Sequence, residues 1–217
     1  MEENKTPREK AFGHVVFAGS RLQFGRPATL PVAEDHPQRP TSFYGIHKVA
    51  AEAYHTAYSQ LHGVPTTVLR LSNPYGFGLT GLQTGYNVLN NFVLLALNGR
   101  EIEVFAPGSQ MRDYVHVRDV VEAFLRAASD ERAAGQSFNI GSGVATRLID
   151  AASTIVDVVG RGKVTLAPWP ERYLAAETGD FVFDVSKARR ELGWQPHVSF
   201  LQGIQMTVER AKSEMTL

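Results

Sequence analysis

The chain has 217 residues, of which 43% are hydrophobic and none is cysteine. This size and composition are typical of a globular protein with a substantial core, and the lack of cysteine excludes disulfides and thiol catalysis. The 22 basic and 22 acidic residues balance, so the net charge does not favour binding to nucleic acid or to an anionic membrane. The longest apolar run, at residues 92–97, is too short for a membrane span or a signal peptide, and we expect a cytoplasmic protein.

The first predicted element in chain order is a short buried strand over residues 14–20. A helix follows, for which Thr41 or Ser42 is the expected N-cap and Gly63 the expected C-terminal stop. A second strand is predicted over residues 66–73, directly after this helix. Strand, helix and strand in this order form a βαβ unit, which predicts a parallel sheet.

Two residues of this helix, Tyr44 and Lys48, are four positions apart. Residues at that spacing share one helix face, so the lysine ammonium can lie beside the phenol and favour its ionised form. A surface lysine beside a half-buried tyrosine has the same spacing, so the pair needs support from other residues. Reacting groups of parallel sheets gather at the carboxyl ends of the strands, and we expect the pair to meet Ser20 and Asn73 at one rim.

Later segments predict further elements. Residues 117–127 are amphipathic and predict a helix. Its apolar stripe consists of Val117, Val120, Val121, Phe124 and Leu125. Residues 167–170 contain two prolines and a tryptophan and predict an irregular connection. The seven histidines form no cluster with carboxylates at ligand spacing, so no metal site is expected.

Six motifs follow one another along the chain. They are the strand of Ser20 with Phe24-Gly25, Tyr44-x3-Lys48, Arg70-Leu-Ser-Asn-Pro-Tyr-Gly76, Gly108-Ser-Gln-Met-Arg-Asp-Tyr-Val-His-Val117, Phe138-Asn-Ile-Gly-Ser-Gly143, and Asp184-Val-Ser-Lys187 with Leu192-Gly-Trp-Gln-Pro196. In this order the chain resembles the extended short-chain dehydrogenase/reductases, in particular the nucleotide-sugar epimerases and dehydratases. The resemblance extends from about residue 14 to residue 203 and is far more specific than any single motif.

The resemblance implies an α/β fold. It would consist of an incomplete Rossmann-type parallel sheet, built of its C-terminal strands only, and a small α/β substrate-binding domain. The remaining part of the Rossmann domain, with the tyrosine and the lysine, is expected over residues 1–76 and 113–143. The substrate-binding domain is expected over residues 77–112 and 144–217.

One feature of the family has no counterpart in this sequence, namely its glycine-rich first βα turn. In relatives the backbone N–H groups of that turn and a helix N-terminus receive the pyrophosphate of NAD. Residues 1–10 are hydrophilic and contain no glycine, and the glycines at 76–78 and 141–143 do not replace the turn. We therefore expect an N-terminally truncated member of the family, whose cofactor is NAD but which alone lacks the groups that hold the pyrophosphate.

The resemblance also implies a role for each residue at the predicted rim. Tyr44 would take the proton of a sugar hydroxyl while hydride leaves the same carbon for NAD, and Lys48 would assist it and hold the nicotinamide ribose. Ser20 would hydrogen-bond the sugar hydroxyl, although a serine at a strand end commonly satisfies backbone groups instead. The implied catalytic and cofactor contacts are Ser20, Tyr44, Lys48, Ser72, Asn73 and Tyr75. The implied substrate contacts are Ser20, Asn73, Asn90, Arg112 and Asp180.

The two residues after Ser20 narrow the reaction. Sugar 4,6-dehydratases of the family carry Asp-Glu there, and the related decarboxylases keep the Glu, whereas this chain has Arg21 and Leu22. Because leucine cannot transfer a proton, we expect epimerisation or 4-keto reduction rather than elimination or decarboxylation. We expect Arg21 to be a solvated surface charge.

The resemblance also implies that Arg112 contacts the diphosphate of the substrate, where a guanidinium fork suits phosphate oxygens. The alternative is a structural ion pair of Arg112 with Asp113 or Asp119. Glu177 stands where galactose epimerases have a second diphosphate-binding arginine. This difference leaves the details of phosphate recognition and the identity of the sugar open. For Asn90, a capping or surface role is the alternative to substrate contact.

Two functions from different classes remain. The first is an NAD-dependent nucleotide-sugar epimerase, similar to UDP-glucose 4-epimerase, that works through a 4-ketosugar, or a nucleotide-sugar 4-ketoreductase that uses the same groups. The second is a truncated, inactive fragment or a sugar-nucleotide-binding module without the pyrophosphate loop. The expected partner is a nucleotide-diphosphate sugar. We also expect a homodimer or other self-association through helices and an exposed sheet edge.

Overall fold

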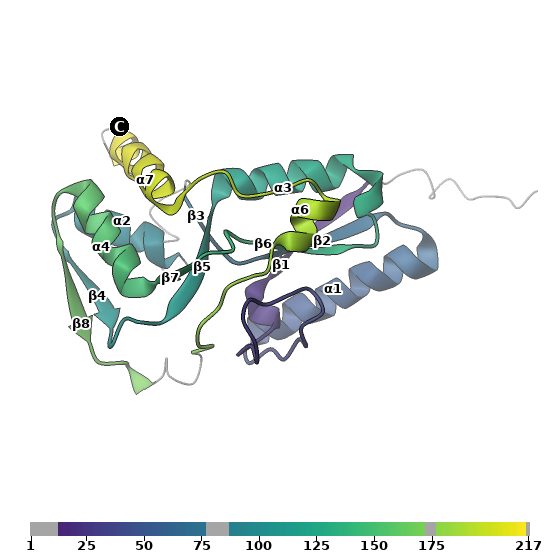
Figure 1. The fold of residues 1–217 in the computed structure, drawn as a ribbon, viewed down its shortest axis with the longest axis horizontal. Helices are drawn as coiled ribbons and strands as arrows, with labels where there is room; N and C mark the ends of the chain where they lie inside the picture. The colour runs from purple at the N-terminus through teal and green to yellow at the C-terminus, as the bar shows by residue number, and fades with distance from the viewer. Residues whose placement is uncertain (1–12, 77–86, 172–176, 216–217) are drawn as a thin grey trace, which may run out of the picture.

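The structure is a computed structural model, and it describes residues 13–76, 87–171 and 177–215. The tail at residues 1–10 and part of the glycine cluster at 76–78 lie outside these ranges. Figure 1 shows two groups of elements side by side, a parallel sheet between helices and a second group of strands and helices. The predicted α/β fold with a parallel sheet is confirmed.

The first sheet has three parallel strands in the order β1 (Val15–Ser20), β2 (Thr66–Leu71) and β6 (Ser137–Ile140). Ser20 pairs with Leu71, and Leu71 pairs with Ile140, so the carboxyl ends of all three strands are aligned. Within the described residues β1 pairs only with β2, and it forms one edge of this sheet.

Helix α1 (Phe43–His62) begins and ends where its sequence predicts. The Ser42 Oγ accepts a hydrogen bond from the Gly45 N–H at 3.1 Å. Gly63 follows the last turn with a φ of 64°, a left-handed conformation that glycine adopts at little cost. In Figure 1, α1 lies on one face of the first sheet and α3 (Val117–Ser129) on the opposite face.

The apolar stripe predicted for α3 is wrong in part. The helix buries Val120, Ala123 and Ala127, whereas Val121 and Leu125 are 52% and 66% exposed. The buried residues recur at spacings of three and four, and the small alanines let the helix approach the strands closely. The larger apolar side chains at the neighbouring positions are therefore left on the outer face.

The second group of elements contains two small sheets. One has the order β3 (Asn73–Tyr75), β5 (Met111–His116) and β7 (Ala145–Arg147), in which β3 and β5 are parallel and β5 and β7 antiparallel. The other is a parallel pair formed by β4 (Glu101–Phe105) and β8 (Lys163–Ala167).

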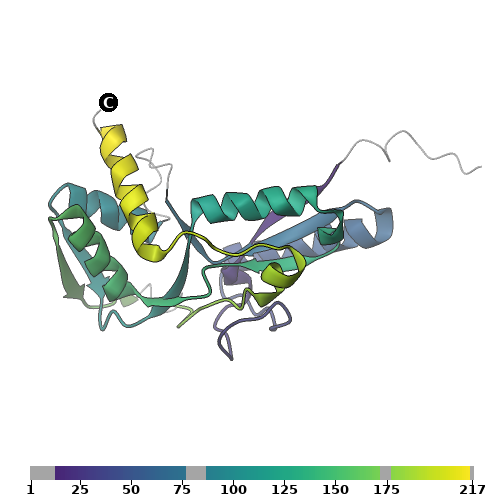
Figure 2. The ribbon, with the colours of Figure 1, turned by 45° about the horizontal axis from the view of Figure 1, so that its top comes forward.

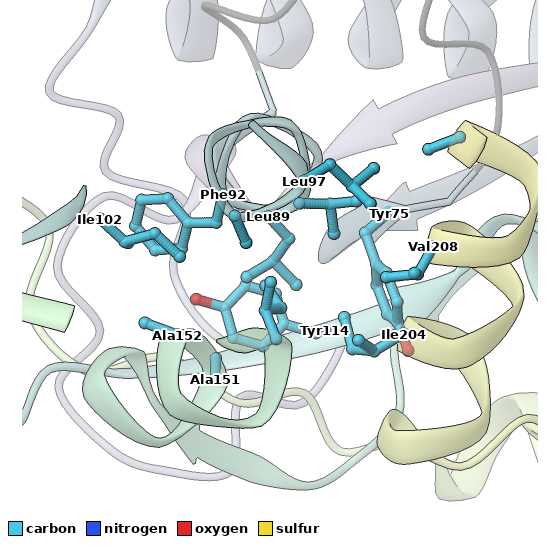
Figure 3. Packing of buried hydrophobic residues seen from close by; sticks show 14 of the residues in the cluster. Tyr75, Leu89, Phe92, Leu97, Ile102, Tyr114, Ala151, Ala152, Ile204 and Val208 are labelled. Atoms are coloured by element: carbon cyan, nitrogen blue, oxygen red, sulfur yellow. The ribbon is translucent and has the colours of Figure 1, made fainter. Parts of the chain in front are cut away.

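Helices α2 (Val88–Leu97), α4 (Leu148–Val159) and α7 (Phe200–Met215) surround an apolar core in this second group. Figure 3 shows how the side chains from the three helices meet around the tyrosine of β5. They include Leu89, Phe92, Ala151, Ala152, Ile204, Val208 and Tyr114. In Figures 1 and 2, α7 lies beside α4 and away from α1.

A second core lies between the first sheet and α3 and contains Leu69, Phe138 and Trp194. The described residues also form three short elements: the 3-10 turns η2 (Arg21–Gln23) and η4 (Glu131–Ala133), and helix α6 (Ser186–Glu191). Each group has an apolar core of its own, which supports the proposed division into a Rossmann part and a substrate-binding domain. None of the helices in the described ranges is long and apolar enough to cross a membrane.

Candidate active site

A cleft of about 1070 Å³ lies between the two groups of elements. The carboxyl ends of β1 and β2 and the start of α1 line one side, and residues of α2, β4 and β5 line the other. The predicted site residues that line it are Ser20, Tyr44, Lys48, Ser72, Asn73 and Arg112. The aligned strand ends thus bring the predicted rim residues together.

Tyr44 and Lys48 lie on one face of α1, as their spacing predicts. The Lys48 Nζ is 5.5 Å from the centre of the Tyr44 ring and donates a hydrogen bond to the Ala18 carbonyl oxygen at 2.8 Å. This bond ties the lysine to β1, two residues before Ser20. An ammonium has three N–H donors, and the described residues use one of them. Two donors therefore remain for a ligand. Tyr44 is 52% exposed and its phenol is open to the cleft.

Ser20 ends β1 and satisfies backbone groups, the alternative role that its position allowed. Its Oγ accepts a hydrogen bond from the Leu22 N–H at 3.2 Å, and its own N–H donates to the Gln23 Oε1 at 2.7 Å. These two bonds form a capping box on η2. A hydroxyl that accepts in this way keeps its hydrogen, so the cap leaves Ser20 able to bind a sugar oxygen.

Close packing of α1 against η2 brings Tyr44 toward Ser20. Gly45 lies at this contact, and a Cβ there would collide with the Leu22 carbonyl oxygen. Only glycine leaves room for the backbone to approach so closely. The glycine after Tyr44 therefore lets the start of α1 pack closely against η2.

A buried polar network next to η2 was missed by sequence reasoning. Gln23 donates to Glu52 Oε2 at 2.5 Å, and the Arg70 Nε donates to both carboxylate oxygens of Glu52 at 3.2 and 3.1 Å. Burial raises the pKa of Glu52, but its hydrogen bonds and the charge of Arg70 outweigh burial and lower it. Glu52 lies four residues after Lys48, just as Lys48 lies four residues after Tyr44. This spacing places Glu52 on the same helix face as the pair and was the sequence signal that could have drawn attention to it.

Arg21 is not the solvated surface charge that we expected. Its side chain lines the cleft, where Nε donates to the Asn73 Oδ1 at 2.9 Å and Nη1 to the Thr178 Oγ1 at 3.1 Å. The guanidinium also lies 5.4 Å from the centre of the Phe181 ring. Burial, followed by the charge of Arg112, lowers the pKa of Arg21 to about 10. Arg21 is the first residue of η2, which follows β1 directly, and its side chain lies in the cleft.

Arg112 forms an ion pair, but with neither of the two aspartates that we considered. Its Nη2 lies 2.6 Å from the Glu177 Oε1, and its Nη1 donates to two backbone carbonyl oxygens. Asp113 and Asp119 instead accept hydrogen bonds from backbone N–H groups. Glu177 therefore counters the charge of the guanidinium that we expected to bind the diphosphate.

The remaining predicted site residues do not line the cleft. Tyr75 packs in the core of the second group and donates to the Phe200 carbonyl oxygen at 3.2 Å. Asn90 bonds both the N–H and the carbonyl of Gly76, at 3.2 and 2.7 Å. Asp180 accepts a hydrogen bond from the first N–H of β5 at 2.8 Å. All three hold the backbone near the site, and their ligand contacts remain predictions.

Two buried hydroxyls and an aromatic pair also line the cleft. The Ser72 Oγ and the Tyr114 Oη have no hydrogen-bond partner within the part of the chain that the structure describes. Trp169 lies in the predicted irregular connection, and its ring centre is 4.9 Å from that of Phe105. Sequence reasoning missed Tyr114 and Phe105 because their distances to the rim depend on the tertiary fold. Buried hydroxyls without partners are costly, which favours a polar ligand in the cleft.

The nicotinamide end of NAD fits these residues better than the pyrophosphate end. Lys48 has donors left, Tyr44 is open to the cleft, and the Ser72 Oγ has no partner among the described residues. The pyrophosphate normally binds at a glycine-rich turn that leads from a parallel strand into a helix. No such turn occurs in the described ranges.

Comparison with known proteins gives consistent matches. The model of the NAD dependent epimerase/dehydratase family matches residues 6–141. The UDP-glucose 4-epimerase of Mycolicibacterium smegmatis is 36% identical over 201 residues, and the match covers 88% of this chain and 60% of that protein. The dTDP-L-rhamnose 4-epimerase of Burkholderia thailandensis is 35% identical, over 90% of this chain and 56% of that protein. The crystal structure of UDP-glucose 4-epimerase with UDP-glucose from Thermotoga maritima matches with a TM-score of 0.86 and 29% identity, over 94% of this chain and 64% of that chain.

The chain thus spans about 60% of the length of the curated relatives that it matches. The family model covers more than half of the chain, including both strands and the helix of the predicted βαβ unit. The fold comparison covers both groups of elements. The chain belongs to the NAD-dependent epimerase/dehydratase family.

Proposed function

We propose that the protein binds a nucleotide-diphosphate sugar in the cleft and acts as an NAD-dependent epimerase, similar to UDP-glucose 4-epimerase. The observation that carries this proposal is the convergence of Ser20, Tyr44 and Lys48 on one cleft. A hydroxyl donor and a phenol beside an ammonium are the groups that oxidation of a sugar hydroxyl requires. The epimerases among the relatives support the choice of substrate class.

In this proposal Tyr44 is the base and Ser20 the hydrogen-bond donor. The Tyr44 phenolate takes the proton of the sugar hydroxyl, the electron pair of the C–H bond leaves as hydride, and a C=O bond forms. NAD, when bound, supplies the acceptor of that hydride and its later donor. Ser20 donates a hydrogen bond to the sugar oxygen throughout. Tyr44 would then return its proton to the oxygen of the 4-ketosugar, and hydride delivered to the opposite face of the carbonyl would invert the carbon.

The position after Arg21 supports epimerisation over elimination. Leu22 lines the cleft, and its side chain has no group that exchanges protons. Loss of water from the sugar needs an acid and a base beside the reacting carbons. Ser20 is followed here by an arginine and a leucine, neither of which provides that base.

Isothermal titration of the purified chain with UDP-glucose and with NAD tests the proposal, followed by a product assay with both present. We expect micromolar binding of UDP-glucose and formation of its epimer. The substitution Tyr44→Phe should slow epimer formation by about 10²- to 10⁴-fold, the usual contribution of a general base, and leave UDP-glucose affinity unchanged. Tyr54→Phe is the matched control, because Tyr54 lies on the same helix and is 69% exposed.

Three outcomes would contradict the proposal in different ways. If the wild type does not bind UDP-glucose, the proposed substrate class, a nucleotide-diphosphate sugar, is wrong. Binding of UDP-glucose without any binding of NAD at millimolar concentration would indicate a sugar-nucleotide-binding module. Reduction of a 4-ketosugar without epimer formation would indicate a ketoreductase.

A further inference from the structure

We propose that Arg21 forms a second anion-binding subsite in the cleft, which takes an acidic group of the substrate, either a carboxylate on the sugar or an oxygen of the diphosphate. The inference rests on the proposed function, because it assigns part of the nucleotide sugar to a residue that would contact it. It concerns a side chain that follows Ser20 directly and lines the same cleft.

The contacts of Arg21 hold its guanidinium in place without neutralising it. Its two hydrogen bonds go to the Asn73 amide oxygen and the Thr178 hydroxyl, which are both uncharged, and its third contact is the face of Phe181. A guanidinium has five N–H donors, so three remain. No carboxylate lies within ion-pair distance of Arg21 in the ranges that the structure describes. A fixed guanidinium with donors to spare is suited to bidentate binding of an anion.

The carboxylates near Arg21 are engaged elsewhere. Glu177 binds Arg112 at 2.6 Å and also accepts from the Gly179 N–H at 2.8 Å. Asp113 is buried and accepts four hydrogen bonds from Ser142 and from neighbouring backbone N–H groups. Glu103 is the other acidic residue of the lining, and it is exposed on β4. The charges of Glu177 and Asp113 act on Arg21, but in the described ranges neither carboxylate forms an ion pair with it.

The two guanidinium groups also act on each other and on a buried hydroxyl. The charge of Arg112 adds to burial in disfavouring the charged form of Arg21. Both arginines act on Tyr114, whose Oη is buried without a partner among the described residues. An anion bound by Arg21 would relieve the repulsion between the like charges, and the Tyr114 hydroxyl is a further donor for it.

Titration calorimetry with UDP, UDP-glucose and UDP-glucuronate tests the subsite and separates its two possible ligands. The variants are Arg21→Gln, which removes the charge, and Arg21→Lys, which keeps the charge but removes the fork. Arg39→Gln is the matched control, because Arg39 is exposed and does not line the cleft. Thermal unfolding of each variant shows whether it is folded, and Arg21→Lys serves alone if Arg21→Gln does not fold.

We expect Arg21→Gln to weaken binding by about tenfold or more, the usual effect of losing a charge-assisted hydrogen bond. Weakening that is confined to UDP-glucuronate assigns the subsite to a sugar carboxylate, whereas equal weakening for all three ligands assigns it to the diphosphate. Arg21→Lys should lie between the wild type and Arg21→Gln.

The inference is overturned if the wild type binds these ligands and the Arg21 variants bind all of them as well as Arg39→Gln does. That result leaves the proposed function intact. If the wild type binds none of the three, the proposed function fails first and the subsite loses its ligand with it.

Discussion

The buried pair of Glu52 and Arg70 gives a quantitative prediction for stability. The substitution Arg70→Met removes the guanidinium and leaves the Glu52 carboxylate at a position where the side chain is only 10% exposed. Removal of one partner of a buried ion pair costs about 3–5 kcal/mol, because the other charge is left uncompensated. Gln23 and Ser137 still donate to this carboxylate, so we expect the lower end of that range, about 3 kcal/mol.

The pH dependence of this loss follows from the pKa of Glu52. In the wild type that pKa lies below its ordinary value, so the pair stabilises the fold at neutral pH and loses its effect as the pH falls through the lowered value. In Arg70→Met the main cause of the lowering is gone, and burial, which the hydrogen bonds from Gln23 and Ser137 oppose, favours the protonated carboxyl. The difference in unfolding free energy between variant and wild type should therefore shrink as the pH falls from about 7 to about 4.

Urea unfolding followed by circular dichroism measures this difference at both pH values. The double substitution Glu52→Leu with Arg70→Met removes both charges and should recover most of the loss. Arg39→Gln is the control for loss of an exposed arginine. If the single variant lies within about 1 kcal/mol of the wild type at neutral pH, the range of a surface pair, Glu52 and Arg70 do not act as a buried ion pair. A double variant no more stable than the single one would lead to the same conclusion.

Further predictions concern the two walls of the cleft and the outer face of α1. Gly45→Ala should destabilise the fold by about 1–3 kcal/mol in thermal or urea unfolding, because its Cβ meets a backbone oxygen of η2; an unchanged midpoint would contradict the packing. Glu177→Gln should tighten UDP binding in calorimetry by about tenfold, because it frees the Arg112 guanidinium; unchanged affinity would mean that Arg112 does not bind phosphate. Leu61→Glu should abolish the expected self-association in light scattering, because Leu61 is 75% exposed on an apolar stripe of α1 with Tyr54; an unchanged mass would place the interface elsewhere.

Local features of this protein could be predicted from the sequence because they depend on neighbours along the chain. The caps of α1 follow from Ser42 and Gly63, and the shared face of Tyr44 and Lys48 follows from a spacing of four. The parallel arrangement of β1 and β2 follows from the order strand, helix, strand. The position of Ser20 at the carboxyl end of a strand then places it at the rim with the helix pair.

The partners of charged side chains were decided by the tertiary structure alone. Arg21 binds Thr178, which lies 157 positions away, and Arg112 binds Glu177, which lies 65 positions away. Which face of α3 is buried was likewise set by how closely Ala123 and Ala127 approach the sheet. Ion pairs and packing form between groups that are close in space, and no spacing along the chain encodes that distance. The sequence alone determined which groups form the proposed redox site, whereas only the fold decided which charges remain available to a ligand.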